Sequence, residues 1–254
     1  MKALITGASS GLGREFARIL AGRGWDLILA ARSTEKLQGL KEQLSGVYVR
    51  VITIDLSREQ DAFDLYDHLK DENIDFLINN AGFGAYGEFE TVPIDVEMRL
   101  IHTNICAVHI LTKQFIKDMI ERGSGMILNV GSMAGFSAGP KLSSYYASKN
   151  YVVRLTEAIH EELRRKNSPV KISVLCPGPV NTNFNNTANV KFSTEGLYPR
   201  DVAEYALDKI EAGKMIIIPS SKMKAVKILE HFLSEKMLTR LSYNIQSSKD
   251  DSSK

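Results

Sequence analysis

Two side chains on one predicted helix have the types and the spacing needed for proton transfer. Tyr145 and Lys149 are four residues apart, which places them on the same helix face. A tyrosine has a pKa near 10, and lowering it by about 3 units takes roughly 4 kcal/mol. An ammonium about 4 Å away supplies about that much at an effective dielectric near 20. Tyr146 is only three residues from Lys149, so Tyr145 is the expected partner, although the pair taken alone is more typical of a solvated helix face.

A turn of small residues follows the first apolar run of the chain. Such a turn lets the backbone reverse sharply and lets a pyrophosphate approach the N-terminus of the next helix. The spacing Gly-x-x-x-Gly-x-Gly is wider than the common Gly-x-Gly-x-x-Gly pattern. A purely structural turn is the alternative, but a predicted strand before it and a predicted helix after it favour a dinucleotide site. The turn residues expected to contact the dinucleotide are Gly7, Ser9, Ser10, Gly11, Leu12 and Gly13.

The end of the second apolar run bears on which dinucleotide would bind. An acidic residue there would hydrogen-bond the ribose 2′-hydroxyl of NAD. The chain has Ala30, Ala31, Arg32 and Ser33 instead. The planar guanidinium of Arg32 can pair with a 2′-phosphate, although a surface arginine without a ligand is an alternative. The sequence therefore predicts a preference for NADP(H), with NAD(H) still possible.

The elements that would position these residues alternate between apolar runs and helical patterns. We expect strands at residues 2–5, 27–30, 49–53, 76–79, 126–130, 170–175 and 215–218. We expect helices at residues 14–22, 34–44, 58–71, 96–122, 144–166 and 199–212. Short apolar strands between helices predict a parallel sheet covered on both faces. Right-handed crossovers then give a three-layer, doubly wound α/β fold with a seven-stranded parallel sheet.

Composition and charge narrow the classes of function. The 254 residues, with a net charge of +2 and scattered basic side chains, fit one α/β domain and do not indicate nucleic-acid binding. The five histidines and the distant Cys106 and Cys176 have no metal-ligand spacing, so we expect no metal site and two free thiols in a reducing compartment. No apolar run approaches the ~18 residues of a membrane span. A strand at the very start leaves no room for a signal peptide, which predicts a cytoplasmic protein.

The last part of the domain is less regular. Residues 225–245 predict one or two amphipathic helices, with an apolar stripe expected to pack on the domain or on a sister subunit, and with peripheral membrane contact as the alternative. The stripe consists of Leu229, Phe232, Leu233, Met237, Leu238 and Leu241. We expect one domain over residues 1–245 and a disordered polar tail at 246–254. The polar segment 183–197 has the length of a lid over a binding pocket.

Several further segments complete a pattern with the glycine turn and the Tyr145/Lys149 pair. They are Asn79-Asn80-Ala81-Gly82 after the fourth strand, Asn104 on the following helix, Ser132 just past the fifth strand, and Pro177-Gly178 after the sixth. Ser132 and Tyr145 are thirteen residues apart. In this order and spacing, the set resembles the short-chain dehydrogenase/reductase family, in its branch of single-domain chains of about this length. The resemblance covers residues 1–219 and implies a Rossmann fold.

The resemblance also implies an activity and a role for each residue. The activity is hydride transfer between a nicotinamide cofactor and a carbonyl or secondary alcohol. Tyr145 would be the general acid/base, Ser132 would orient the carbonyl, and Lys149 would lower the pKa of Tyr145. Asn104 would support a proton relay.

Cofactor contacts follow from the same resemblance. Asp55 would hold the adenine edge, and Asn80 would contact the adenosine-side ribose. Val180 and Thr182 would touch the nicotinamide end. The full set implied to bind cofactor adds Arg32, Leu56, Ala81, Gly82, Tyr145, Lys149, Pro177 and Gly178 to these residues and to the glycine turn.

Two other classes of function are weighed against this one. A catalytically silent NADP-binding regulator is disfavoured because all four catalytic positions are filled. An isomerase or dehydratase on a nicotinamide scaffold is disfavoured because such relatives have a different glycine spacing and a longer chain. We expect a small-molecule carbonyl or alcohol substrate, no nucleic-acid partner and no integral membrane segment. The resemblance further implies a homodimer or homotetramer paired through the helices at 96–122 and 144–166.

Overall fold

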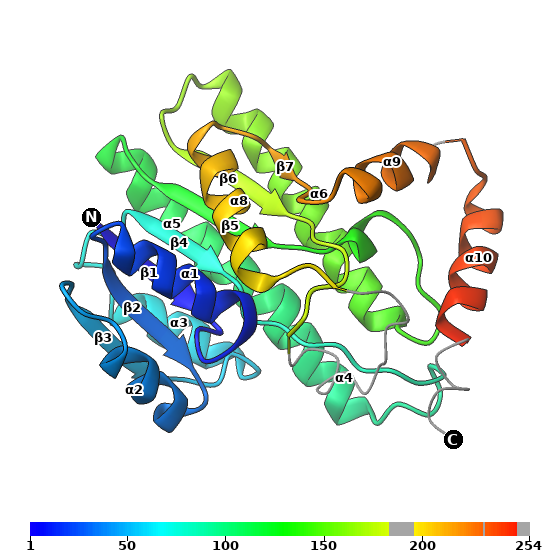
Figure 1. Ribbon diagram of the computed structural model, residues 1–254, viewed down its shortest axis with the longest axis horizontal. Helices are drawn as coiled ribbons and strands as arrows, with labels where there is room; N and C mark the ends of the chain where they lie inside the picture. Colours follow the sequence, from blue (N-terminus) through cyan, green and yellow to red (C-terminus); the bar gives the residue numbers. More distant parts are fainter. Residues whose placement is uncertain (183–195, 231, 248–254) are drawn as a thin grey trace.

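The computed structural model describes residues 1–182, 196–230 and 232–247 (Figure 1). Within them one sheet has the order β3-β2-β1-β4-β5-β6-β7, with every neighbouring pair parallel. The strands are β1 (Lys2–Thr6), β2 (Asp26–Ala31), β3 (Val49–Thr53), β4 (Phe76–Asn79), β5 (Met126–Val130), β6 (Lys171–Leu175) and β7 (Ile216–Ile217). The predicted seven-stranded, doubly wound parallel sheet is confirmed.

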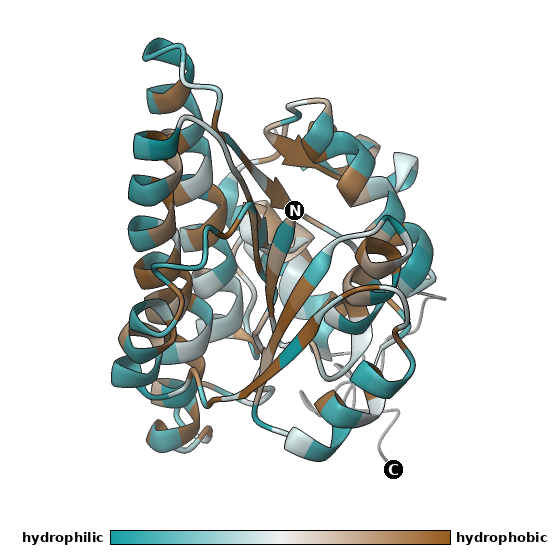
Figure 2. Cartoon of the chain, turned by 90° about the vertical axis from the view of Figure 1, so that its left-hand side faces the viewer, coloured by the Kyte–Doolittle hydropathy of each residue, from teal (hydrophilic) through white to brown (hydrophobic). Residues whose placement is uncertain are grey.

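Helices cover both faces of the sheet and bury two apolar layers. One face carries α1 (Gly11–Gly22), α2 (Thr34–Glu42) and α8 (Pro199–Glu211). The other face carries α3 (Glu59–Asp67), α5 (Ala107–Arg122) and α6 (Ser143–Arg165). Figure 2 shows that the strands between these layers are predominantly apolar. The strands are therefore buried on both faces, as expected for a parallel sheet in this architecture.

The long helix predicted at 96–122 is interrupted by a wider turn. It consists of α4 (Ile94–Ile101), a π-helical turn η1 (His102–Cys106) and α5, in one continuous run. Such single π turns are rare inside α-helices and occur often at functional sites. Here the turn contains Asn104, whose side chain is fully buried.

Two buried asparagines connect the central strands with the helices below the carboxyl edge of the sheet. Asn79 Nδ2 on β4 donates to Asn129 Oδ1 on β5 at 2.9 Å and to Thr112 Oγ1 on α5 at 3.0 Å. Asn129 Nδ2 donates to Thr156 Oγ1 on α6 at 3.0 Å. Buried polar groups of this kind are stabilising only when they are paired, so the network fixes β4, β5, α5 and α6 relative to one another.

The C-terminal elements lie outside the three layers. They are α9 (Ser221–Glu230) and α10 (Glu235–Ser247), at the right of Figure 1. The α10 helix extends two residues beyond the expected domain end at 245, and Gln246, expected in a disordered tail, is buried in it. Residues 248–254, and all of the predicted lid except Gly196 and Leu197, lie outside the described residues. No helix in the described ranges is long and apolar enough to span a bilayer.

Candidate active site

The glycine turn forms an open cradle at the carboxyl end of β1. Gly7 and Gly11 have φ angles of 64° and 53°, which side-chain-bearing residues rarely adopt. A Cβ atom on Gly13 would lie 2.4 Å from the carbonyl oxygen of Gly7, so only glycine lets α1 approach the turn this closely. Ser10 is the N-cap residue of α1, and the first turn of that helix contains no acidic residue. The exposed N–H groups at this helix end suit a pyrophosphate.

The second wall of the cradle is braced by Thr6 and Asn80. The Thr6 hydroxyl accepts hydrogen bonds from the N–H groups of Asn80 and Ala81, at 3.0 and 3.1 Å. Asn80 Nδ2 donates to the carbonyl oxygens of Thr6 and Gly7, at 2.9 and 3.1 Å. The family resemblance implied a ribose contact for Asn80, which stays a prediction, and its amide hydrogens here fix the glycine turn. Thr6 was missed as a site residue, and its place at the end of β1, beside the first glycine, was the available signal.

Three of the four predicted catalytic residues converge at the carboxyl end of β5. Ser132 follows this strand and caps the short 3₁₀ helix η2 (Met133–Phe136), where its hydroxyl accepts from Ala134 N at 3.1 Å. Tyr145 and Lys149 lie in the first two turns of α6, and Tyr145 is hydrogen-bonded to the Ser132 side chain. The Lys149 Nζ atom lies 5.8 Å from the centre of the Tyr145 ring. Hydroxyl, phenol and ammonium therefore form one cluster.

The fourth residue, Asn104, holds the cluster to the loop after β4. Its Oδ1 accepts from Phe83 N at 3.1 Å, and its Nδ2 donates to Phe83 O at 2.9 Å. Nδ2 also donates to Ser148 Oγ at 3.0 Å, and Ser148 Oγ donates to the Tyr145 carbonyl at 2.7 Å. Ser148 was not predicted, although a serine three residues after Tyr145 falls on the same helix face. Asn104 thus couples α6 to the Phe83 loop.

Burial changes the acid–base properties of the pair. Burial raises the pKa of Tyr145 to about 12, although the hydrogen bond with Ser132 acts in the opposite direction and lowers this pKa. Burial lowers the pKa of Lys149 to about 8, because the charged form is the one that loses hydration. Lys149 Nζ donates to the carbonyl oxygen of Val130 at 2.8 Å. The side chain is therefore an ammonium at neutral pH, held against the end of β5.

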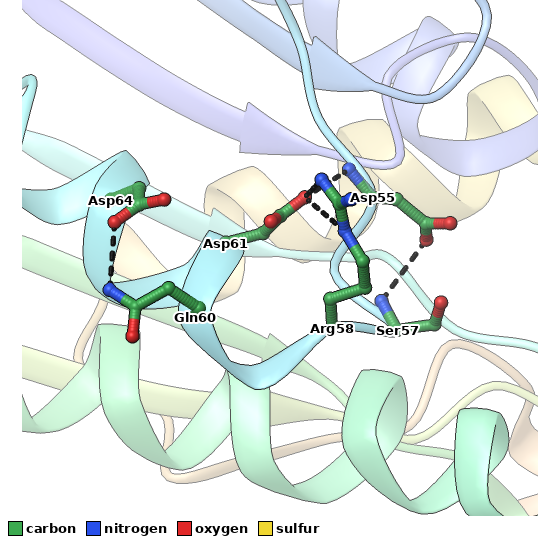
Figure 3. A network of polar contacts seen from close by, with 6 residues as sticks. All are labelled: Asp55, Ser57, Arg58, Gln60, Asp61 and Asp64. Atoms are coloured by element: carbon green, nitrogen blue, oxygen red, sulfur yellow. Dashed lines mark hydrogen bonds and ion pairs between the residues drawn. The ribbon is translucent and has the colours of Figure 1, made fainter.

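A shallow cavity of about 360 Å³ lies at the carboxyl ends of β2 and β3. It is lined by Arg32, Thr53, Ile54, Asp55, Arg58 and Asp61. Figure 3 shows Arg58 paired with Asp61, whose Oδ2 lies 2.8 Å from Arg58 Nη2 and accepts from Asp55 N at 3.1 Å. Asp55 in turn accepts from Ser57 N at 3.1 Å. Arg32 and Asp55, two predicted cofactor contacts, thus border the same cavity.

The remaining predicted contacts lie between the glycine turn and the catalytic cluster. A Cβ on Gly82 would lie 3.1 Å from Asn104 Oδ1 and 3.4 Å from Lys149 Nζ. A Cβ on Gly11 would lie 3.2 Å from Thr182 Cγ2, so the loop after β6 crosses over the glycine turn. In that loop, Pro177 O accepts from Met133 N at 3.0 Å, and Val180 pairs with Leu197. A Cβ on Gly178 would lie 3.0 Å from Met223 Cγ on α9. Leu56 is the exception, because its side chain is buried in the core.

A second cavity, of about 400 Å³, lies beside the catalytic cluster rather than on it. Its lining includes Arg32, Phe83, Tyr86, Val92 and Val96, and so joins the cofactor cavity to the loop that Asn104 holds. No cluster of three or more His, Cys, Asp or Glu side chains able to hold a metal occurs among the described residues.

The C-terminal helix reaches a group of aromatic residues that includes Tyr145. Gln246 Nε2 donates to the Tyr146 hydroxyl at 2.7 Å, and the Tyr86 hydroxyl donates to the Gln246 carbonyl at 2.9 Å. Gln246 is 3% exposed, and it is the one buried residue of α10. Tyr86, Leu142, Tyr145 and Tyr146 form a small apolar cluster beneath it. No sequence pattern indicated this contact, which joins residues 100 positions apart.

Known proteins are similar to this chain in both sequence and fold. A family described as short chain dehydrogenase matches residues 1–191. The chain is similar to the 17-beta-hydroxysteroid dehydrogenase type 3 of Homo sapiens, with 33% identity over 203 residues, which are 76% of this chain and 63% of that enzyme. The chain thus spans less than two thirds of that relative's length.

Two solved structures show the same architecture with a dinucleotide bound. The first is a short-chain dehydrogenase from Sphingobium yanoikuyae in complex with NADPH, with 29% identity, a TM-score of 0.82, and coverage of 91% of this chain and 93% of the other. The second is a short chain dehydrogenase/reductase from Burkholderia phymatum in complex with NAD, with 27% identity, a TM-score of 0.82, and coverage of 91% and 92%. The chain therefore belongs to the short-chain dehydrogenase/reductase family, and it is an oxidoreductase that uses a nicotinamide cofactor to interconvert an alcohol and a carbonyl.

Proposed function

We propose that this protein is an NADP(H)-preferring reductase or dehydrogenase in which Tyr145 is the general acid/base. The observation that carries the proposal is the convergence of Ser132, Tyr145 and Lys149 at the end of β5, beside a glycine cradle that a Cβ atom would fill. The cradle would hold the pyrophosphate, and Gly82, Lys149 and Thr182 would border the nicotinamide end. The nicotinamide, when bound, supplies or accepts the hydride.

In the reducing direction, Tyr145 donates the proton. The Ser132 hydroxyl donates a hydrogen bond to the substrate carbonyl and stabilises the negative charge that develops on its oxygen. The phenolic proton of Tyr145 then passes to that oxygen. A pKa raised to about 12 by burial keeps this phenol protonated at neutral pH, which suits an acid.

In the oxidising direction, Tyr145 must act as a base, and its pKa has to fall. An ammonium 5.8 Å from the ring centre favours the phenolate by roughly 3 kcal/mol at an effective dielectric near 20, or about 2 pKa units. That acts against burial, which raises the pKa of Tyr145. Further lowering needs the second positive charge of the oxidised nicotinamide. Lys149 would also bind the nicotinamide ribose, which would tie cofactor binding to activation.

The preference for NADP(H) rests on the cavity at the ends of β2 and β3. Arg32 is in the position where a carboxylate would select NAD, and it borders that cavity together with Arg58. An arginine fork pairs well with a 2′-phosphate, while Asp55 lies on the same wall and can take the adenine edge. NAD(H) remains usable because the pyrophosphate cradle does not depend on the 2′-position.

The substrate side favours a bulky, partly apolar ketone or secondary alcohol. Phe83, Tyr86, Val92 and Val96 line the larger cavity, and α10 closes over the adjacent tyrosine cluster. The similarity to a hydroxysteroid dehydrogenase points the same way.

We also propose a cytoplasmic homodimer or homotetramer. Ile120 on α5 and Tyr151 on α6 are exposed large apolar residues on the two helices expected to pair the subunits. Both cysteines are free thiols, which suits a reducing compartment.

The acid/base role is tested by Tyr145→Phe, with Tyr151→Phe on the same helix as the matched control. Oxidation of NADPH is followed by absorbance with a panel of aldehydes and ketones, and cofactor binding by the fluorescence of NADPH. We expect Tyr145→Phe to lower kcat by at least about 100-fold while NADPH still binds, because a positioned acid contributes that much. Turnover by Tyr145→Phe within a few-fold of the wild type would reject the assignment.

A further inference from the structure

The two C-terminal helices leave a run of large apolar side chains facing solvent. Phe232 is 80% exposed, Ile228 63% and Leu229 62%, at the end of α9 and just past it. On α10, Met237, Leu241 and Ile245 are exposed as well. We call these six residues the outer stripe. Their number is unusual, because apolar residues exposed singly are common, whereas several exposed apolar residues on two successive helices are typical of an interaction surface.

The hydrogen bond of Gln246 fixes which face of α10 points outwards. Gln246 is held against Tyr146, so the opposite face of the helix must point away from the domain. Met237, Leu241 and Ile245 recur every four residues and span an arc of about 80° on that side. The outer stripe on α10 is therefore exposed because of how the helix is anchored. Of the stripe expected from the sequence to pack on the domain or on a sister subunit, Met237 and Leu241 do not pack on the domain.

Positive charge borders the outer stripe on both helices. Lys222 on α9 and Lys236 and Arg240 on α10 are exposed. On α10 the two cations lie about 100° and 60° around the helix from Met237, and on α9 Lys222 lies about 20° from Leu229, about two turns away along the helix. Residues 221–247 contain five basic and two acidic side chains, an excess of three positive charges in a chain whose total is +2. The positive charge of the protein is thus concentrated at the helices that carry the stripe.

We propose that the outer stripe docks this protein on an anionic lipid surface. A helix with an apolar stripe flanked by lysine and arginine lies in the plane of a bilayer interface, with the cations at the level of the headgroup phosphates. Neither α9 nor α10 is long enough to cross the bilayer, so the contact is peripheral. A second copy of this chain would bring the same excess of positive charge to the contact, whereas anionic headgroups complement that charge. The charge therefore favours lipid over a second copy.

The proposal is tested on the full-length protein by flotation with two kinds of vesicle. One kind is phosphatidylcholine alone, and the other is phosphatidylcholine mixed with phosphatidylglycerol. The variants are Phe232→Gln for the stripe and Lys236→Glu for its border. Tyr48→Gln is the matched control, because Tyr48 is also an exposed aromatic residue, 61% exposed, in the loop before β3.

We expect the wild type and Tyr48→Gln to float with the mixed vesicles, and to do so less as salt is raised. Phe232→Gln and Lys236→Glu should each weaken binding by about tenfold. A wild-type protein that binds neither vesicle overturns the proposal, and so does equal binding of both vesicles. Light scattering that shows an oligomer dissolved by Phe232→Gln also overturns it, because a second copy would then cover the stripe. None of these outcomes depends on the activity proposed above.

Discussion

Replacing Lys149 by methionine isolates the free-energy cost of the buried ammonium next to Tyr145. The side chain is 5% exposed, and its pKa falls from an ordinary value of 10.5 to about 8 because burial penalises the charged form. A fall of about 2.5 units corresponds to roughly 3 kcal/mol of lost folding free energy at neutral pH. The methionine side chain carries no charge, so that cost would be absent from the variant.

The sign follows from proton uptake. Between about pH 8 and pH 10.5, the unfolded chain binds more protons at this position than the folded protein, so the free energy of unfolding of the wild type rises with pH. Burial also raises the pKa of Cys176 to about 12, which lowers stability as pH rises through this range. Burial, the largest cause of that shift, is common to the wild type and Lys149→Met, whereas the Lys149 charge lowers the Cys176 pKa by a smaller amount, so most of the Cys176 contribution cancels in their difference.

The measurement is urea unfolding of both proteins at a series of pH values from 7 to 10.5. We expect the stability of Lys149→Met relative to the wild type to fall by about 3 kcal/mol across this range. Lys41→Met, at an exposed position on α2, is the control and should show a constant difference. A pH-independent difference for Lys149→Met would mean that the buried lysine keeps its ordinary pKa, and the electrostatic reasoning would fail.

Two further substitutions address the cofactor and the C-terminal helix. Arg32→Ala should raise the KM for NADPH by at least about tenfold and the KM for NADH by less than about threefold, because a charged hydrogen-bonded pair is lost only with NADPH. The control Arg18→Ala, on the exposed side of α1, should change neither KM. An equal rise in KM for both cofactors would reject the 2′-phosphate assignment. Gln246→Leu removes the bond to Tyr146 and should raise the substrate KM by about threefold to tenfold while kcat changes little. Steady-state kinetics of Gln246→Leu beside Gln43→Leu, an exposed position, provide the test, and an unchanged KM would exclude a role for α10 in shaping the substrate site.

The sequence was informative where function depends on local patterns. Short apolar runs separated by helical periodicity predicted the parallel sheet, and the spacing of Tyr145 and Lys149 predicted that they share a helix face. The glycine turn could likewise be predicted from the sequence, because the positive φ angles at Gly7 and Gly11 restrict these positions to glycine.

Contacts that form only in the folded chain could not be predicted from the sequence. The amide of Asn80 braces the glycine turn, and Asn104 donates to Ser148, through hydrogen bonds between segments distant in the chain. The bond from Gln246 to Tyr146 is the extreme case, since neither residue has a spacing that indicates the other. Hydrophobic periodicity predicted that residues 225–245 are helical, but it could not show which face would point outwards.

The π-helical turn at Asn104 has a consequence for the phase of the long helix. Each residue of an α-helix advances by 100°, so one additional residue in a turn rotates everything beyond it by that angle. The apolar face of α5 thus points in a different direction around the helix axis from the apolar face of α4. The α5 face packs on the sheet, whereas α4 contacts α6. Removing a single residue between His102 and Cys106 would restore a regular helix, but it would either turn the α5 face away from the core or draw the Asn104 amide away from Phe83. The additional residue in this helix therefore sets both the face that α5 turns to the sheet and the position of Asn104 beside the catalytic cluster.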